Sequence, residues 1–142
     1  MNIQESLGYL LNTSAKLIKR TMDNELEKYH ITTSQWSVMK LLDTRKELTQ
    51  TQIANELLGD RATAGEIILK LYEKNYIEKT LDKNDRRTYL VSLTPKTKTI
   101  IRDMEIMTNK IIKKALKDFN ENDTQILYKS LYQIIDNLSK ED

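Results

Sequence analysis

The chain has 142 residues, which is the size of one ordinary domain and enough to bury a real core. It contains no cysteine and a single histidine, His30, so the sequence excludes a disulfide framework, a thiolate zinc site and a His-rich metal site. The net charge of +2 says little about partners by itself. We therefore predict a protein that holds no metal and no cofactor.

Targeting and catalytic signals are also missing from the sequence. Residues 1–20 lack the apolar run of a signal peptide, and no stretch approaches the roughly 18–20 apolar residues of a membrane span. We find no nucleophile–base pair, carboxylate dyad or Gly-rich phosphate loop. These patterns predict a cytoplasmic protein that has no membrane partner and is not an enzyme.

Helical periodicity dominates the first third of the chain. Apolar residues three to four positions apart predict one helix over residues 3–29 and a second over 34–44. Either Thr33 or Ser34 is expected to be the N-cap of the second helix, because both side chains can accept a hydrogen bond from a free backbone amide.

The next two predicted helices are joined by a short turn. The third helix begins with the T-x-x-Q capping box that starts at Thr49, and Gly59 is expected to end it. Asp60 is placed to cap a fourth helix over about 61–74, and Asn75 tolerates the left-handed conformation that closes many helices. A helix, a short turn and a helix have the spacing of a helix-turn-helix motif.

After the fourth helix the apolar period changes from 3.6 to 2. The segments NYIEKTL and TYLVSLT predict a two-stranded hairpin with one buried face, and the charged stretch DKNDRR forms its tip. An isolated hairpin is marginally stable, so it must pack on the helices.

Two further helices are expected, over 95–119 and 124–138. The first begins at Thr94-Pro95, an N-cap followed by proline at the first helical position. Their apolar stripes, with that of the first helix, exceed what a small core can cover. The predicted fold is therefore mainly α with a small β-hairpin, and we expect the chain to form a homodimer.

Several of these segments resemble one known family. The stretch DRATAGEIILKLYEKNYIEKTLDKNDRRTYLVSLTPK is similar to the recognition helix and wing of the MarR (multiple antibiotic resistance regulator) family. The segments ITTSQWSVMKLL and LTQTQIANELL resemble that family's second and third helices, and the D-x-R motif at Asp85 is the most specific part. The resemblance implies one MarR-type domain over 1–142, with a winged helix-turn-helix over about 32–94 and dimerisation helices over 1–31 and 95–142.

The resemblance also implies a function. It implies a homodimeric transcriptional regulator that binds a pseudo-palindromic operator in double-stranded DNA, in many members a repressor released by a small-molecule effector. The recognition helix would enter the major groove, and the wing, 82–88, would enter the minor groove with Arg87 held by Asp85. The expected DNA-binding residues are Thr49, Gln50, Arg61, Thr63, Gly65, Glu66, Lys70, Lys83, Asp85, Arg86 and Arg87.

Two of these positions depart from the family pattern. Many family members carry Thr and Arg where this chain has Gly65 and Glu66. A glutamate on the DNA side repels phosphate but can accept a hydrogen bond from a cytosine amino group. We therefore expect an altered operator, with no effect on the fold.

Plainer interpretations of the same residues stay open at this point. Residues 60–91 carry seven basic and six acidic side chains, so DKNDRR could be a solvated loop with an internal ion pair. Thr63 could be bonded to Asp60, and Thr49 and Gln50 could contact phosphate or cap a helix. The alternative function is a helical dimer that binds a protein and has lost DNA binding.

The effector-binding residues are predicted from the resemblance to the MarR family. The family often has a pocket near the junction of the dimerisation helices and the DNA-binding part, which suggests Tyr9, His30, Trp36 and Met39 as ligand-binding residues. Trp36 and Met39 could equally be core residues, and His30 an exposed cation at a helix end.

Overall fold

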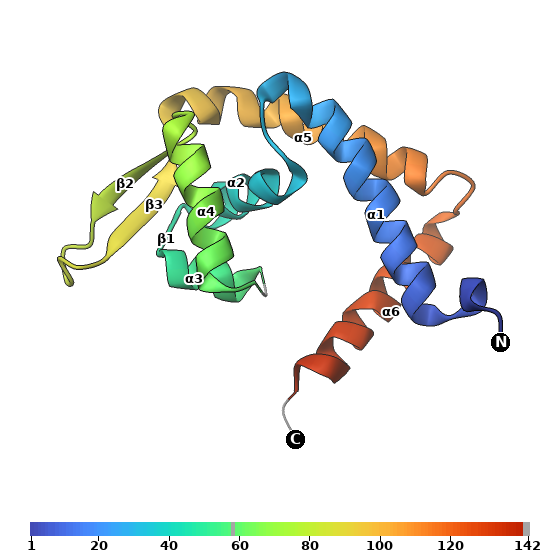
Figure 1. The fold of residues 1–142 in the computed structure, drawn as a ribbon. Coiled ribbons are helices and arrows are strands. Elements are labelled where there is room, and N and C mark those ends of the chain that lie inside the picture. The colour runs from blue at the N-terminus through green and yellow to red at the C-terminus, as the bar shows by residue number, and fades with distance from the viewer. Residues whose placement is uncertain (58, 141–142) are drawn as a thin grey trace.

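The computed structural model describes residues 1–57 and 59–140 of the chain. The helices are α1 Leu7–Leu26, α2 Thr33–Arg45, α3 Gln50–Glu56, α4 Arg61–Glu73, α5 Pro95–Ala115 and α6 Glu121–Ser139. The strands and the 3-10 turns are β1 Glu47–Leu48, β2 Ile77–Leu81, β3 Tyr89–Leu93, η1 Ile3–Glu5 and η2 Glu27–Tyr29. Figure 1 shows the winged-helix part, α2 to β3, on one side and α1 and α6 on the other, with α5 running across from the end of β3 to α1.

The first predicted helix is divided into three pieces. Ser6 caps α1 by accepting a hydrogen bond from the Tyr9 amide at 3.3 Å, so η1 is separate from α1. At the other end η2 closes at His30, whose φ of 59° lies in the left-handed region. The chain therefore turns sharply before α2.

The N-cap of α2 differs from the prediction by one or two positions. Thr32 caps the helix, because its hydroxyl accepts from the Gln35 amide at 3.2 Å and the Gln35 side chain accepts from the Thr32 amide at 3.1 Å. The expectation of Thr33 or Ser34 was wrong. Thr33 instead donates its hydroxyl to Asp23 at 2.7 Å, which ties α2 to α1.

The predicted starts of α3, α4 and α5 are confirmed. Thr49 and Gln52 form the expected capping box of α3, and Asp60 accepts from the Thr63 amide at the start of α4. Thr94 caps α5 with proline directly after it. Asn75 has a φ of 63°, as expected for a left-handed residue that ends a helix.

Several predicted helix ends are shifted. α3 ends at Glu56 with Leu57 as C-cap, so the expected stop at Gly59 lies beyond the helix. α5 ends at Ala115 and not at 119, and α6 begins at Glu121, three residues before the predicted start at 124.

The predicted two-stranded hairpin is confirmed, and β1 joins it as a third strand that the sequence did not predict. β1, β3 and β2 form one antiparallel sheet in that order. Leu81 lies opposite Tyr89 in the hairpin, and β1 places Leu48 opposite Val91. The extra strand attaches the sheet to the turn between α2 and α3.

Only the base of the hairpin has the predicted buried face. Ile77, Val91 and Leu93 are buried, whereas Leu81 is 50% and Tyr89 is 53% exposed. Figure 1 shows the reason, because the hairpin extends past the helices and its outer half has no element beneath it. The outer half is therefore free to contact another molecule.

The core lies where α1, α2, α4, α5 and the base of the sheet meet. Its largest fully buried side chains include Leu26, Met39, Leu42, Leu71 and Met104. A buried polar contact fixes α5 against the sheet, since the Thr97 hydroxyl donates to the Tyr76 carbonyl at 2.7 Å. This core sets the positions of α3, α4 and the hairpin.

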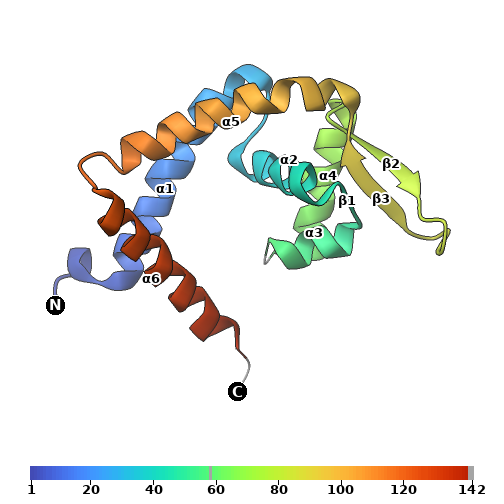
Figure 2. The same cartoon turned by 180° about the vertical axis from the view of Figure 1, so that it is seen from behind.

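The long helices are covered unevenly. α1 and α5 lie side by side, while α6 runs back from the end of α5 and stands away from the winged-helix part (Figures 1 and 2). None of the described residues of α6 is buried. None of the helices in the described part of the chain is long and apolar enough to cross a membrane.

Candidate nucleic-acid interface

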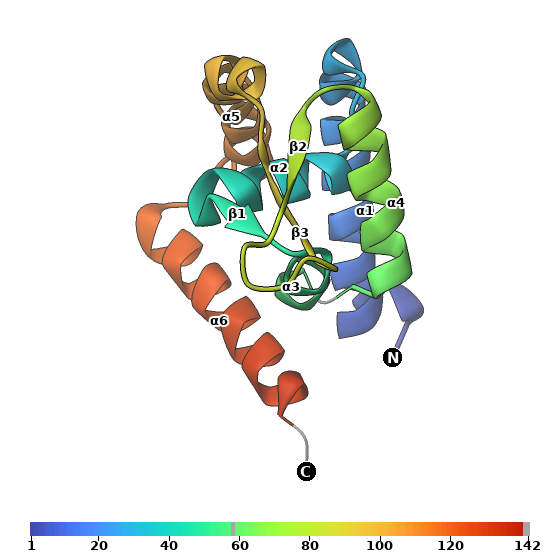
Figure 3. The ribbon, with the colours of Figure 1, turned by 90° about the vertical axis from the view of Figure 1, so that its left-hand side faces the viewer.

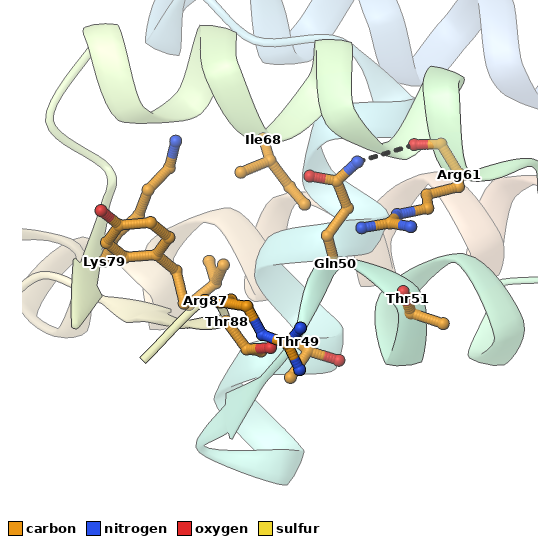
Figure 4. A pocket seen from close by; sticks show the side chains of 10 residues that line it. Thr49, Gln50, Thr51, Arg61, Ile68, Lys79, Arg87 and Thr88 are labelled. Atoms are coloured by element: carbon orange, nitrogen blue, oxygen red, sulfur yellow. Dashed lines mark hydrogen bonds between the residues drawn. The ribbon is translucent and has the colours of Figure 1, made fainter. Parts of the chain in front are cut away.

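A hollow of about 370 Å³ lies between α3, α4 and the hairpin. Figures 1 and 3 show the start of α3, the start of α4 and the hairpin facing the same side of the molecule, and Figure 4 shows the hollow itself. The hollow is lined by Thr49, Gln50, Thr51, Arg61, Ile68, Lys79, Arg87, Thr88, Tyr89 and Val91.

The lining is positively charged. Arg61, Lys79 and Arg87 contribute three cations, and none of the ten lining residues is acidic. Because α4 and the hairpin as a whole carry almost as many acids as bases, this local excess does not show in the sequence. The fold brings three of the cations, and none of the acids, to the lining of the hollow.

Arg87 is the cation that the wing, 82–88, contributes to the lining of the hollow. Its side chain is 92% exposed, and its Nε lies 3.3 Å from the Asp85 carboxylate. The Arg87 backbone amide also donates to Asp85 at 3.0 Å, and the Thr88 hydroxyl donates to the same carboxylate at 3.2 Å. Asp85 therefore fixes both the backbone and the guanidinium of Arg87.

These hydrogen bonds favour the ionised form of Asp85. The Arg87 amide is the largest cause that holds the pKa of Asp85 below its ordinary value, followed by the Arg87 side chain. The remaining wing cations, Lys83 and Arg86, are exposed on the same loop but do not line the hollow.

Thr63 does not line the hollow. Its amide and its hydroxyl donate to the two carboxylate oxygens of Asp60 at 2.7 and 2.8 Å, so Thr63 has the capping role that the sequence left open. It lines a second, mostly apolar cavity of about 270 Å³ between α2, α3 and α4. The amide of Thr63 is the largest cause that lowers the pKa of Asp60.

Gly65 and Gln50 are in close contact where α3 crosses α4. The Gln50 side chain donates from Nε2 to the Arg61 carbonyl at 3.0 Å (Figure 4). A methyl group at position 65 would lie 2.8 Å from that nitrogen. Glu66 and Lys70 are exposed further along α4 and do not line the hollow.

The sequence prediction missed Lys79 and Tyr89 as site residues. Both occupy odd positions of the hairpin, on the face that was expected to be buried. A lysine on an apolar face is a signal that this part of the face is not covered. Lys79 also lies 4.7 Å from the centre of the Tyr72 ring, which holds it beside α4.

The four expected effector residues fall into two groups. Trp36 and Met39 are core residues, with 7% and 0% of their surface exposed. Tyr9 on α1 and His30 after η2 are exposed. None of the four lines the hollow, and a ligand role for them stays a prediction. Among residues 1–57 and 59–140, no three His, Asp or Glu side chains are grouped as a metal site would need.

Comparison with known proteins gives matches to one family. Residues 31–89 match the model of the MarR family. The chain is 28% identical over 123 residues to the HTH-type transcriptional regulator YwoH of Bacillus subtilis, a match that covers 87% of this chain and 89% of YwoH.

Solved structures share the fold. S. aureus MepR in its complex with DNA superimposes with a TM-score of 0.85 at 20% identity, over 93% of this chain and 98% of MepR. Bordetella bronchiseptica BpsR, whose DNA binding is regulated by 6-hydroxynicotinic acid, gives a TM-score of 0.83 at 19% identity over 100% of this chain and 99% of BpsR. The winged helix of this chain thus matches the MarR family model, and similarity to a transcriptional regulator extends along nearly the whole chain.

Proposed function

We propose that this protein is a homodimeric transcriptional regulator that binds a specific DNA operator and acts as a ligand-responsive repressor. In this proposal α4 enters the major groove and the wing, 82–88, enters the minor groove. It acts by binding and not by catalysis, in keeping with the regulators it resembles. By that role we place it in the cytoplasm.

The cationic hollow carries the DNA-binding part of the proposal. Phosphate neutralisation by basic side chains supplies most of the affinity of DNA-binding proteins, and an arginine suits the strongly negative minor groove. Arg61, Lys79 and Arg87 provide these charges beside two polar segments, the starts of α3 and α4. MepR, which has the same fold, has been solved with DNA bound.

The exposed apolar side chains support the dimer. Large hydrophobic residues on α1 and α6 are exposed in the single chain, among them Leu7 at 61%, Tyr132 at 72% and Leu138 at 81%. Exposed apolar surface of this extent marks an interaction site. We propose that 1–31 and 95–142 form the dimer interface and that 32–94 form the DNA-binding part.

The proposed response to a ligand is based on a protein of the same fold, BpsR. BpsR combines the same fold with DNA binding that a small aromatic acid regulates. We propose an effector of this chain as well, without assigning its chemistry.

DNA-binding measurements test the proposal. The protein should shift a labelled fragment of the DNA upstream of its own gene in a gel, and unlabelled fragment should compete better than a scrambled fragment of equal length. The affinity should fall steeply as salt rises from 50 to 200 mM. Equal competition by both fragments, or no binding at low salt, would contradict a sequence-specific regulator. The alternative function, a helical dimer that binds a protein, would not explain the cationic hollow. We therefore do not favour it.

A further inference from the structure

We propose that Gln50 of α3 determines operator specificity by reading an adenine, and that Gly65 of α4 makes this contact available. The inference rests on the proposed DNA-binding function and names one of its base-reading residues. Its starting point is the contact between α3 and α4, where Gly65 of α4 has no side chain and the Gln50 side chain of α3 lies over it.

The first observation is steric. The three heavy atoms nearest to a methyl group built at Gly65 all belong to the Gln50 side chain, at 2.8, 3.4 and 3.6 Å. The amide group of Gln50 therefore occupies the space directly over Gly65. Alanine or any larger residue at position 65 would push it away.

The second observation is the way in which Gln50 is held. One N–H of its amide donates to the Arg61 carbonyl at 3.0 Å, which anchors the side chain on α4. In Figure 4 its Oε1 points away from Arg61. Within the described residues this is the one hydrogen bond of the Gln50 side chain, so its second N–H and its Oε1 are left for a ligand.

The third observation is chemical. Arg61, Lys79 and Arg87 are donors only, and the hydroxyls around the hollow each offer a single oxygen. Gln50 is the one side chain among the ten lining residues with a donor atom and an acceptor atom side by side. A carboxamide of this kind pairs with adenine in the major groove, donating to N7 and accepting from the N6 amino group. The hollow thus combines cations for phosphate with one amide for a base.

Selection of operators from a random DNA pool tests this proposal. Wild-type protein should select adenine at one position of each half-site, and Gln50→Ala should lose that preference with a fall in affinity for the best operator of roughly 5- to 150-fold. Replacing the selected adenine with 7-deazaadenine, which lacks the N7 acceptor, should weaken wild type and leave Gln50→Ala unaffected.

The variant Gly65→Ala distinguishes a loss of base recognition from a loss of folding stability. It should lose the same preference because its methyl displaces Gln50, yet its melting temperature should hold or rise, since alanine favours a helix interior over glycine. In the Gln50→Ala background it should have no further effect on preference. Gly59→Ala is the matched control, because a methyl there has nothing within 4 Å and Gly59 lies outside both the hollow and the proposed dimerisation helices.

Two results would overturn the inference and leave the proposed function intact. One is a Gln50→Ala protein that binds all sequences more weakly but selects the wild-type operator, as a phosphate contact would. The other is a Gly65→Ala protein with unchanged preference. A wild-type protein that selects no sequence at all would overturn the proposed function together with this inference.

Discussion

Single side chains decide how the wing is held. Asp85 accepts three hydrogen bonds, two of them from Arg87, although it is an acid on the surface that we propose meets DNA. Deleting such a charge should strengthen DNA binding on electrostatic grounds alone. Its contacts to Arg87 argue for the opposite effect, because they hold the guanidinium in place.

Arg87→Ala should weaken operator binding by about 1–3 kcal/mol and make it less salt-dependent. Asp85→Ala should also weaken it. Asp82→Asn should bind as well as wild type or better, because it removes an acid of the same loop whose carboxylate accepts from the Asn84 amide and not from Arg87. Titrations by fluorescence anisotropy at several salt concentrations measure these effects, and melting curves should show all three variants folded. Tighter binding by Asp85→Ala, with Arg87→Ala unchanged, would mean that the wing tip is only a solvated loop.

The starts of α3, α4 and α5 were predictable from the sequence because a cap is a local arrangement. Thr49, Asp60 and Thr94 each have one suitable amide within three residues, and the structure confirms all three. The start of α2 was placed wrongly because three residues that can cap stand in a row. The choice falls on Thr32 because Gln35, three residues later, can return the hydrogen bond.

Thr32→Ala should therefore destabilise the protein by about 0.5–2 kcal/mol, the usual cost of losing an N-cap. Ser34→Ala, which removes a neighbouring hydroxyl with no cap role, should change the free energy of unfolding by much less. Urea unfolding at one fixed protein concentration compares them. If Ser34→Ala is the more damaging change, α2 begins where the sequence alone suggested.

Helices α2 and α5 are joined by a ring of four charges. Lys40 and Arg102 both contact Glu105 and Asp43, with Arg102 2.5 Å from Glu105 and 3.4 Å from Asp43. The Lys40 hydrogen bond is the largest cause that holds the pKa of Glu105 below its ordinary value. A carboxyl whose pKa is lowered by folding stabilises the protein above its unfolded pKa and stops doing so as the pH falls through the folded value.

Glu105→Gln should accordingly lower the melting temperature at pH 7, and the difference from wild type should shrink as the pH falls below the ordinary range of a glutamate. High salt should shrink it too, because the ring is partly exposed. Lys129→Gln is a suitable control, since it removes one charge from α6 outside the ring. A difference that stays constant from pH 7 to pH 3 would show that packing, and not charge, is responsible.

At the scale of the whole molecule, contacts between segments that are distant in the chain could not be predicted from the sequence. β1 was missed because a two-residue strand has no pattern of its own and is defined by its pairing with Val91 and Ser92. The hollow was only partly foreseen because it unites α3, α4 and both hairpin strands, and the near balance of charge along the chain hides its three cations. The Gln50–Gly65 contact has no sequence signal beyond the glycine.

In the single chain, the expected dimer interface is visible as exposed apolar surface on α1 and α6. Ile135 is 52% exposed and lies with Tyr128, Leu131 and Tyr132 in an apolar depression on α6. We expect a stable homodimer that buries roughly 2,000 Å² or more. Two-fold symmetry would then place two α4 helices in successive major grooves, on half-sites about 10 base pairs apart.

Ile135→Asp should dissociate the dimer, because it puts a charge into an apolar interface, and operator binding should weaken with it since each monomer keeps only one half-site. Gln133→Asp adds the same charge to an exposed polar position of α6 and should leave the protein dimeric. Sedimentation velocity at micromolar concentration measures the assembly, and footprinting measures the protected DNA. A wild-type protein that sediments as a folded monomer, or one that protects a single asymmetric half-site, would contradict the symmetric arrangement on which this prediction depends.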